Sequence, residues 1–200
     1  RYLDIARYLG AVDPPATCSL PIDREKAVMR DRLGKTVGGP GRVVAINPVA
    51  RWKTKLWQEE KFARLADRLI AEKKAAVIFT GGAADREVIS RIMGMMDHKA
   101  FNWAGETTLK ELAALASLTD LFITTDTGPM HLAAAAGGKV VALFGPTSPW
   151  RTGPYGDGHV VVRKGLECSP CFRRECGAGV RCMEAITVEE VMDQLPPWGE

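Results

Sequence analysis

Short apolar runs alternate with amphipathic stretches along most of this 200-residue chain. The runs have the length of buried strands, and the stretches between them carry apolar side chains at helical spacing. Strands are predicted at residues 43–46, 75–79, 99–102, 120–124, 139–144 and 159–163, the last at a sheet edge. Helices are predicted at residues 58–71, 85–95, 109–116, from Asp126 onward, and at 187–195. This alternation predicts an α/β fold, a Rossmann-like parallel sheet with helices on both faces.

The first 41 residues follow a different pattern. Residues 1–9 form an amphipathic helix pattern that Gly10 ends, and residues 11–21 hold three prolines. Asp23 is predicted to cap a short helix that runs to Leu33, before glycines between 34 and 41. We therefore expect a linker with short helices at 1–41 and one sheet-forming domain at 42–200. A helix without a lead-in suggests a piece of a longer protein.

Composition and charge argue against a nucleic-acid-binding protein and against a membrane-spanning one. The net charge of +3 and the scattered basic residues give little support for a nucleic-acid surface. No apolar stretch reaches the roughly 18 residues of a membrane span, and no signal-peptide pattern is present. We expect a cytoplasmic site of action.

Polar residues gather where the strand at 120–124 gives way to an alanine-rich helix. Asp126 or Thr127 can cap this helix, Gly128 permits close approach to the backbone, and His131 falls in the first turn. Free amides at a helix start attract anions. The segment therefore predicts an anion site, against the plainer alternative of ordinary helix capping.

Three further loops follow predicted strands. Arg51, Lys53 and Lys55 follow the first strand, and Gly81-Gly82 precede Asp85 and Glu87 after the second. Thr107 or Thr108 can cap the helix at 109–116. Ligands of parallel sheets bind beyond the carboxyl ends of the strands, where all of these residues lie. Neither a GxGxxG nor a GxxxxGK[ST] motif is present, which argues against NAD and P-loop chemistry.

Four cysteines fall within 15 residues, at Cys168, Cys171, Cys176 and Cys182, with Cys18 far away. The spacing alone is compatible with structural zinc or an iron–sulfur cluster. Structural cysteines, reduced or partly oxidised, are the third interpretation, and we expect no catalytic metal.

Several motifs together resemble one family. Asp126-Thr-Gly-Pro-Met-His131 and Leu143-Phe-Gly-Pro-Thr147 are similar to the signature of glycosyltransferase family 9, the bacterial heptosyltransferases of lipopolysaccharide core assembly. The similarity continues in residues 47–57 and 168–176. It implies the C-terminal half of a two-domain GT-B glycosyltransferase, with the donor-binding domain at 42–200, a cysteine-rich loop at 166–183, and the acceptor-binding half with its catalytic base elsewhere.

The resemblance also implies roles for individual residues. Lys55, with Arg51 beside it, would contact the donor phosphates, and Asp85 or Glu87 the ribose. The backbone of Thr107 and Thr108 would line the base pocket. Lys55, the helix-start amides at Thr127 and Gly128, and His131 would stabilise the departing diphosphate. Asp126 would contribute to the donor site by orienting the sugar or His131. The family uses no cofactor and no metal in transfer, although it carries similar cysteines.

The function implied is inverting transfer of a heptose from ADP-heptose to a lipid A–Kdo core acceptor. The acceptor would be bound through the other half, in the cytoplasm, at the inner face of the inner membrane. Two alternatives stay open: another GT-B nucleotide-sugar enzyme such as a UDP-sugar epimerase, or a metal-stabilised interaction module built on the cysteine loop. Nucleotide preference and metal content separate the three.

Overall fold

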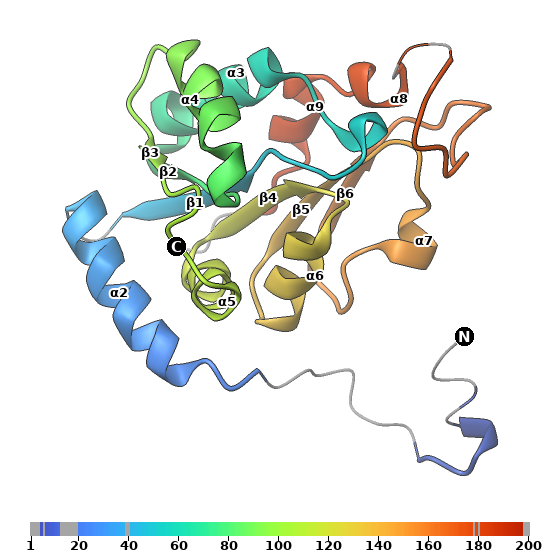
Figure 1. Cartoon of the computed structure of the whole chain (residues 1–200), viewed down its shortest axis with the longest axis horizontal. Helices are drawn as coiled ribbons and strands as arrows, with labels where there is room; N and C mark the ends of the chain where they lie inside the picture. Colours follow the sequence, from blue (N-terminus) through green and yellow to red (C-terminus); the bar gives the residue numbers. More distant parts are fainter. Residues whose placement is uncertain are drawn as a thin grey trace.

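A six-stranded parallel sheet forms the centre of the molecule (Figure 1). This computed structural model describes residues 5, 7–12, 20–38, 41–177, 179 and 181–197. The strand order is β3-β2-β1-β4-β5-β6, which is the Rossmann order with its switch point between β1 and β4. The strands are β1 (Arg42–Asn47), β2 (Ala75–Phe79), β3 (Phe101–Asn102), β4 (Leu121–Thr125), β5 (Val140–Phe144) and β6 (Val160–Arg163). All six predicted strands are confirmed, with β6 at the edge.

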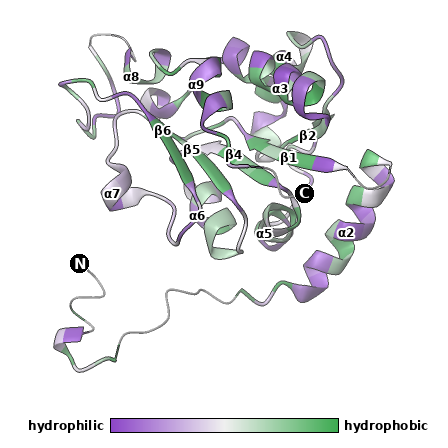
Figure 2. Ribbon diagram, turned by 180° about the vertical axis from the view of Figure 1, so that it is seen from behind, coloured by the Kyte–Doolittle hydropathy of each residue, from purple (hydrophilic) through white to green (hydrophobic). Residues whose placement is uncertain are grey.

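Helices cover both faces of this sheet, as predicted (Figures 1 and 2). Val44 and Ile46 of β1 pack into a core cluster with α3, α4, α8 and α9, whereas Val43 and Ala45 face a second cluster with α2, α5 and α6. The helices are α2 (Asp23–Val37), α3 (Glu59–Lys73), α4 (Arg86–Gly94), α5 (Leu109–Leu118), α6 (Gly128–Ala135), α7 (Pro149–Thr152), α8 (Arg181–Glu184) and α9 (Val188–Asp193). Short 3₁₀ turns lie at η1 (Lys53–Lys55) and η2 (Ala83–Asp85). Among the residues described, no helix is both long and apolar enough to cross a membrane.

Some predicted boundaries were wrong. Helix α2 does not end at Leu33 but continues to Val37, where Gly38 closes it with a φ of 77°. Met29 and Leu33 are buried against α5, and this packing outweighs the cost of Gly34 inside the helix. Asp23 is the first helical residue and makes no cap hydrogen bond. The short helices α7 and α8 were not predicted.

The described residues test only part of the predictions for the N-terminal segment. Residues 5, 7 and 8 are helical, but residues 1–4, 6 and 13–19, with Cys18 among them, lie outside the described residues. The division at residue 41 stays a prediction, although α2 packs on the sheet-forming part of the chain.

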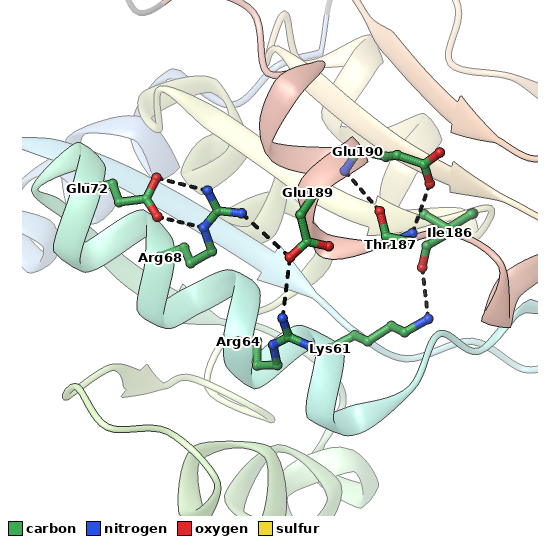
Figure 3. Close-up of polar contacts among 8 residues, drawn as sticks. All are labelled: Lys61, Arg64, Arg68, Glu72, Ile186, Thr187, Glu189 and Glu190. Carbon is green, nitrogen blue, oxygen red and sulfur yellow. Dashed lines mark hydrogen bonds and ion pairs between the residues drawn. The ribbon is translucent and has the colours of Figure 1, made fainter.

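The C-terminal helix α9 docks on α3 (Figure 3), and Ile186, just before α9, contacts the loop that follows β1. Thr187 caps α9, as predicted, by accepting from the Glu190 amide at 3.2 Å. Lys61 donates to the Ile186 carbonyl at 2.9 Å, and Trp57 Nε1 donates to the same carbonyl at 3.0 Å. Because Trp57 is buried, this contact anchors the end of the basic loop that carries Lys55.

Candidate functional site

A cavity of ≈ 470 Å³ lies at the carboxyl edge of the sheet, across the switch point. Its walls come from the loops after β1, β2, β3 and β4, so the predicted convergence of these loops is confirmed. Among the predicted site residues, six line this cavity: Arg51, Asp85, Thr107, Thr108, Thr127 and Gly128. Asn47, Val49, Ala50, Gly81, Gly82, Leu109, Leu112 and Pro129 complete the lining. The lining combines one cation, Arg51, and three glycines with apolar side chains such as Leu109 and Leu112.

The start of α6 lacks a side-chain cap. Thr127 occupies the N-cap position, but its hydroxyl contacts the Thr125 carbonyl at 3.4 Å instead of a helix amide. The capping role predicted for Asp126 or Thr127 was therefore wrong. Pro129 carries no N–H, and the Met130 amide donates to the Thr127 carbonyl at 3.2 Å. These contacts leave the exposed Gly128 amide as the helix-start donor beside the cavity.

Asp126 instead holds Lys55. The Lys55 ammonium lies 2.7 Å from Asp126 Oδ2 and donates to the Asp126 carbonyl at 3.1 Å. Only 16% of the Lys55 side chain and 5% of the Asp126 side chain are exposed. The ammonium also lies 4.5 Å from the ring centroid of Trp52. Since an ammonium has three N–H donors, this arrangement fixes Lys55 next to Thr127 and leaves one donor for a ligand.

Of the two candidate carboxylates that follow β2, only Asp85 lines the cavity. Asp85 Oδ2 accepts from the Gly82 amide at 2.8 Å, which fixes its carboxylate in the turn at the cavity. The Glu87 side chain is 88% exposed and lies 3.7 Å from Arg91, and Glu87 does not line the cavity. Of the two carboxylates that the sequence left open, the geometry favours Asp85 as the ligand contact.

The loop after β3 is held rigidly. Thr108 accepts from the Glu111 amide at 3.2 Å, and the Thr108 amide donates to Glu111, which lowers the pKa of that carboxyl. Arg32 of α2 donates to the Glu106 carbonyl at 2.8 Å and stacks on Trp103 at 3.9 Å. Gly105 has a φ of +72°, and a Cβ there would lie 2.7 Å from Ala83 Cα. Thr108 is thus a cap, as predicted, in a pre-formed wall.

His131 takes a different position. It is exposed in the first turn of α6 and does not line the cavity. Its predicted part in supporting a diphosphate stays a prediction.

Buried polar atoms without hydrogen-bond partners gather at the same edge. In the described part of the chain, there are five such side-chain atoms: Asn47 Oδ1, Asp126 Oδ2, Thr147 Oγ1, Ser148 Oγ and Arg163 Nε. All lie at or just after the carboxyl ends of β1, β4, β5 and β6, and Asp126 Oδ2 has the ion pair with Lys55. Such groups are rare in protein interiors and indicate a polar ligand or water.

Asn47 was missed by sequence reasoning. Its Nδ2 donates to the Thr80 carbonyl at 3.1 Å, which leaves Oδ1 buried at the cavity. The signal in the sequence was an asparagine that ends an apolar strand just before Pro48.

The four clustered cysteines all border one small cavity of ≈ 40 Å³ between η1, the loop after β6 and α8. They are free thiols, with Cys168 and Cys176 exposed and Cys182 buried. Burial raises the pKa of Cys182. Within the described residues, no three thiol, carboxylate or imidazole groups converge closely enough to hold a metal ion.

Metal content tests the interpretation of this loop. We expect protein purified under reducing conditions to contain less than one zinc per chain by elemental analysis, and chelation to leave nucleotide affinity unchanged. Full zinc occupancy, with unfolding on chelation, would restore the metal-stabilised module.

Comparison with known proteins identifies the family. The model of glycosyltransferase family 9 (heptosyltransferase) matches residues 6–180. The chain belongs to this family. Among solved structures, the family 9 glycosyltransferase from Veillonella parvula superimposes with a TM-score of 0.81 at 24% identity, over 96% of this chain and 57% of that one. ADP-heptose lipopolysaccharide heptosyltransferase II of Escherichia coli superimposes with a TM-score of 0.73 at 26% identity, over 89% of this chain and 51% of that one.

Sequence relatives agree. Lipooligosaccharide heptosyltransferase 2 of Campylobacter jejuni is 33% identical over 159 residues, which cover 76% of this family 9 chain and 50% of the relative. Lipopolysaccharide heptosyltransferase 1 of Pseudomonas aeruginosa is 32% identical over 125 residues, 62% of this chain and 35% of the relative. The resemblance drawn from the motifs is confirmed. The chain spans about half the length of the first of these relatives.

Proposed function

We propose that this chain is the donor-binding half of an inverting GT-B heptosyltransferase, which moves a heptose from ADP-heptose to a lipid A–Kdo core acceptor. The observation that carries the proposal is the cavity at the switch point, which Arg51, Thr127 and Gly128 line. The Lys55–Asp126 pair does not line the cavity, but its Asp126 lies directly before Thr127. A nucleotide diphosphate needs such a combination of cation, helix-start amide and enclosed groove.

The cavity suggests how the donor is held. The diphosphate would lie against Lys55, Arg51 and the Gly128 amide, the ribose against Asp85, and the base between the Thr107–Thr108 backbone and Leu112. When the glycosidic bond breaks, negative charge grows on the departing diphosphate. Fixed donors at that point would lower the barrier because they need no reorganisation.

The acceptor chemistry would require the other half of a GT-B enzyme. There, a carboxylate would remove the proton of the attacking acceptor hydroxyl as it reaches the anomeric carbon. We propose no cofactor and no catalytic metal, and a site of action in the cytoplasm at the inner face of the inner membrane. The names of the relatives support this substrate class: the Escherichia coli protein is described as an ADP-heptose lipopolysaccharide heptosyltransferase, and the Campylobacter jejuni protein as a lipooligosaccharide heptosyltransferase.

Calorimetric titration with ADP, UDP and GDP tests this proposal. We expect the purified chain to bind ADP weakly, in preference to UDP and GDP, and to transfer no sugar, because it supplies donor contacts without the base. A preference for UDP would favour an epimerase-like enzyme, and rapid transfer by the 200-residue chain would contradict the assignment of the base to another domain.

A further inference from the structure

The carboxyl edge of the sheet extends beyond the cavity at the switch point, which we call the donor cavity. The loops after β5 and β6 lie beside α7 (Figure 1). Together they carry three arginines, Arg151, Arg173 and Arg174, and we call the surface that these residues define the arginine shelf. The Phe172 amide donates to the Pro146 carbonyl at 2.8 Å, and the Thr54 hydroxyl donates to the Arg173 carbonyl at 2.8 Å. The shelf therefore adjoins the η1 turn that carries Lys55.

Positive charge on the shelf lacks counter-charges. Arg151, Arg173 and Arg174 are exposed, and in the described part of the chain none lies within ion-pair distance of a carboxylate. Arg32 and Arg91 lie in ion pairs, whereas the exposed Arg24 and Arg30 of α2 resemble the shelf arginines in having none within the described residues. Residues 145–181 hold six arginines and lysines against three acidic residues, among which Glu167 and Glu175 lie in the loop itself. The excess of cations indicates an anionic partner.

Two of the shelf arginines, Arg151 and Arg174, lie over aromatic rings. The Arg174 guanidinium lies 5.1 Å from the Trp52 centroid, and the Arg151 guanidinium lies 5.4 Å from the Phe172 centroid. The neighbouring Trp150 is 71% exposed and holds Arg163 at 5.2 Å. A guanidinium stacked on a ring keeps its planar N–H edge available for a carboxylate or phosphate.

Buried polar atoms without partners lie at the same strand ends. Thr147 and Ser148, each 2% exposed, follow β5, and Arg163 ends β6. Of the five buried atoms without hydrogen-bond partners in the described part of the chain, only Asn47 Oδ1 belongs to a residue that lines the cavity, and those of Thr147, Ser148 and Arg163 lie next to the shelf. Their number on this side suggests that the edge binds polar groups beyond those of the nucleotide.

We propose that the arginine shelf binds the anionic part of the acceptor saccharide, through its carboxylate or phosphate groups. The shelf borders the Lys55 turn, so an acceptor seated there would present a hydroxyl close to the diphosphate of the donor. This inference rests on the proposed function. It assigns acceptor recognition to the donor-binding chain as well as to the other half.

Binding of soluble probes to the purified chain tests this proposal. The probe is the oligosaccharide released from lipopolysaccharide by de-acylation, and maltoheptaose is the neutral reference. We expect the shelf variant R151Q/R174Q to raise the Kd for the oligosaccharide about tenfold. The matched variant R24Q/R30Q on α2 removes the same charge from exposed positions and should leave that Kd unchanged. Both variants should bind ADP within twofold of the original chain.

Each other outcome would overturn the proposal. If the α2 variant raises the Kd for the oligosaccharide as much as the shelf variant does, the effect comes from net charge alone. If the shelf variant leaves that Kd unchanged, Arg151 and Arg174 do not bind the oligosaccharide. A large loss of ADP affinity would make the shelf part of the donor site. Shelf-dependent binding to phosphatidylglycerol vesicles, without binding of the oligosaccharide, would identify a membrane surface instead. Failure of the original chain to bind ADP contradicts the proposed function separately, because the oligosaccharide titration does not depend on it.

Discussion

Replacement of Lys55 by alanine is expected to weaken ADP binding by about 1.5–3 kcal/mol, the usual loss for one charge-assisted hydrogen bond. The ammonium is held 2.7 Å from Asp126 Oδ2 and 3.1 Å from the Asp126 carbonyl, so its position is fixed before a ligand arrives. A fixed cation loses little side-chain entropy when it binds a phosphate. Calorimetry should therefore record a Kd that rises roughly tenfold to a hundredfold.

Lys53→Ala is the matched control. Lys53 lies in the same turn, carries the same charge and is exposed. We expect its replacement to change the Kd for ADP by less than threefold, which is about 0.7 kcal/mol. Circular dichroism of both variants should match that of the original chain, so that lost affinity is not lost folding. Equal losses in the two variants would mean that the loop is only an electropositive surface.

Much of the fold was predictable because the signals were local. The buried strands at 75–79 and 121–125 are short apolar runs, and the Thr108 and Thr187 caps follow from residues three positions apart. Parallel strands bring their carboxyl ends to one edge, so the gathering of the loops into one cavity followed from topology. The end of α2 was misjudged because its packing on α5 is not visible in the pattern of α2 itself.

The site was less predictable because its main contact is not local. Asp126 reads as a helix cap when only its neighbours are considered, yet it lies 71 residues from the lysine that it holds. Asn47, Thr147 and Ser148 were not predicted as site residues for the same reason. A side chain that is buried without a hydrogen-bond partner can be recognised only from the folded structure. That Asp85 lines the cavity and Glu87 does not likewise depends on the η2 turn, in which Asp85 accepts from the Gly82 amide.

Asp126→Asn is expected to lower the free energy of unfolding by about 1–3 kcal/mol, since it leaves the largely buried Lys55 ammonium without a counter-charge. A plain capping role predicts almost no change, because asparagine caps a helix as well as aspartate does. Asp120→Asn offers a comparison, since Asp120 accepts a hydrogen bond from the Val43 amide at 2.7 Å but belongs to no ion pair in the described part of the chain. Urea unfolding of both variants measures the difference. A neutral result for Asp126→Asn would mean that the ion pair with Lys55 contributes nothing measurable to the free energy of unfolding.

A double-mutant cycle measures the interaction energy between Lys55 and Asp126 apart from their contacts with other residues. Lys55→Ala alone leaves the Asp126 carboxylate buried without its cation, and Asp126→Asn alone leaves the cation without its carboxylate. Together the two substitutions remove both charges, so the double variant should be more stable than the sum of the single losses predicts, by about 1 kcal/mol or more. Strict additivity would show that the 2.7 Å contact does not couple the two residues. Coupling of this size would establish that the Asp126 carboxylate and the Lys55 ammonium stabilise each other in the folded chain, as the proposed positioning of Lys55 by Asp126 requires.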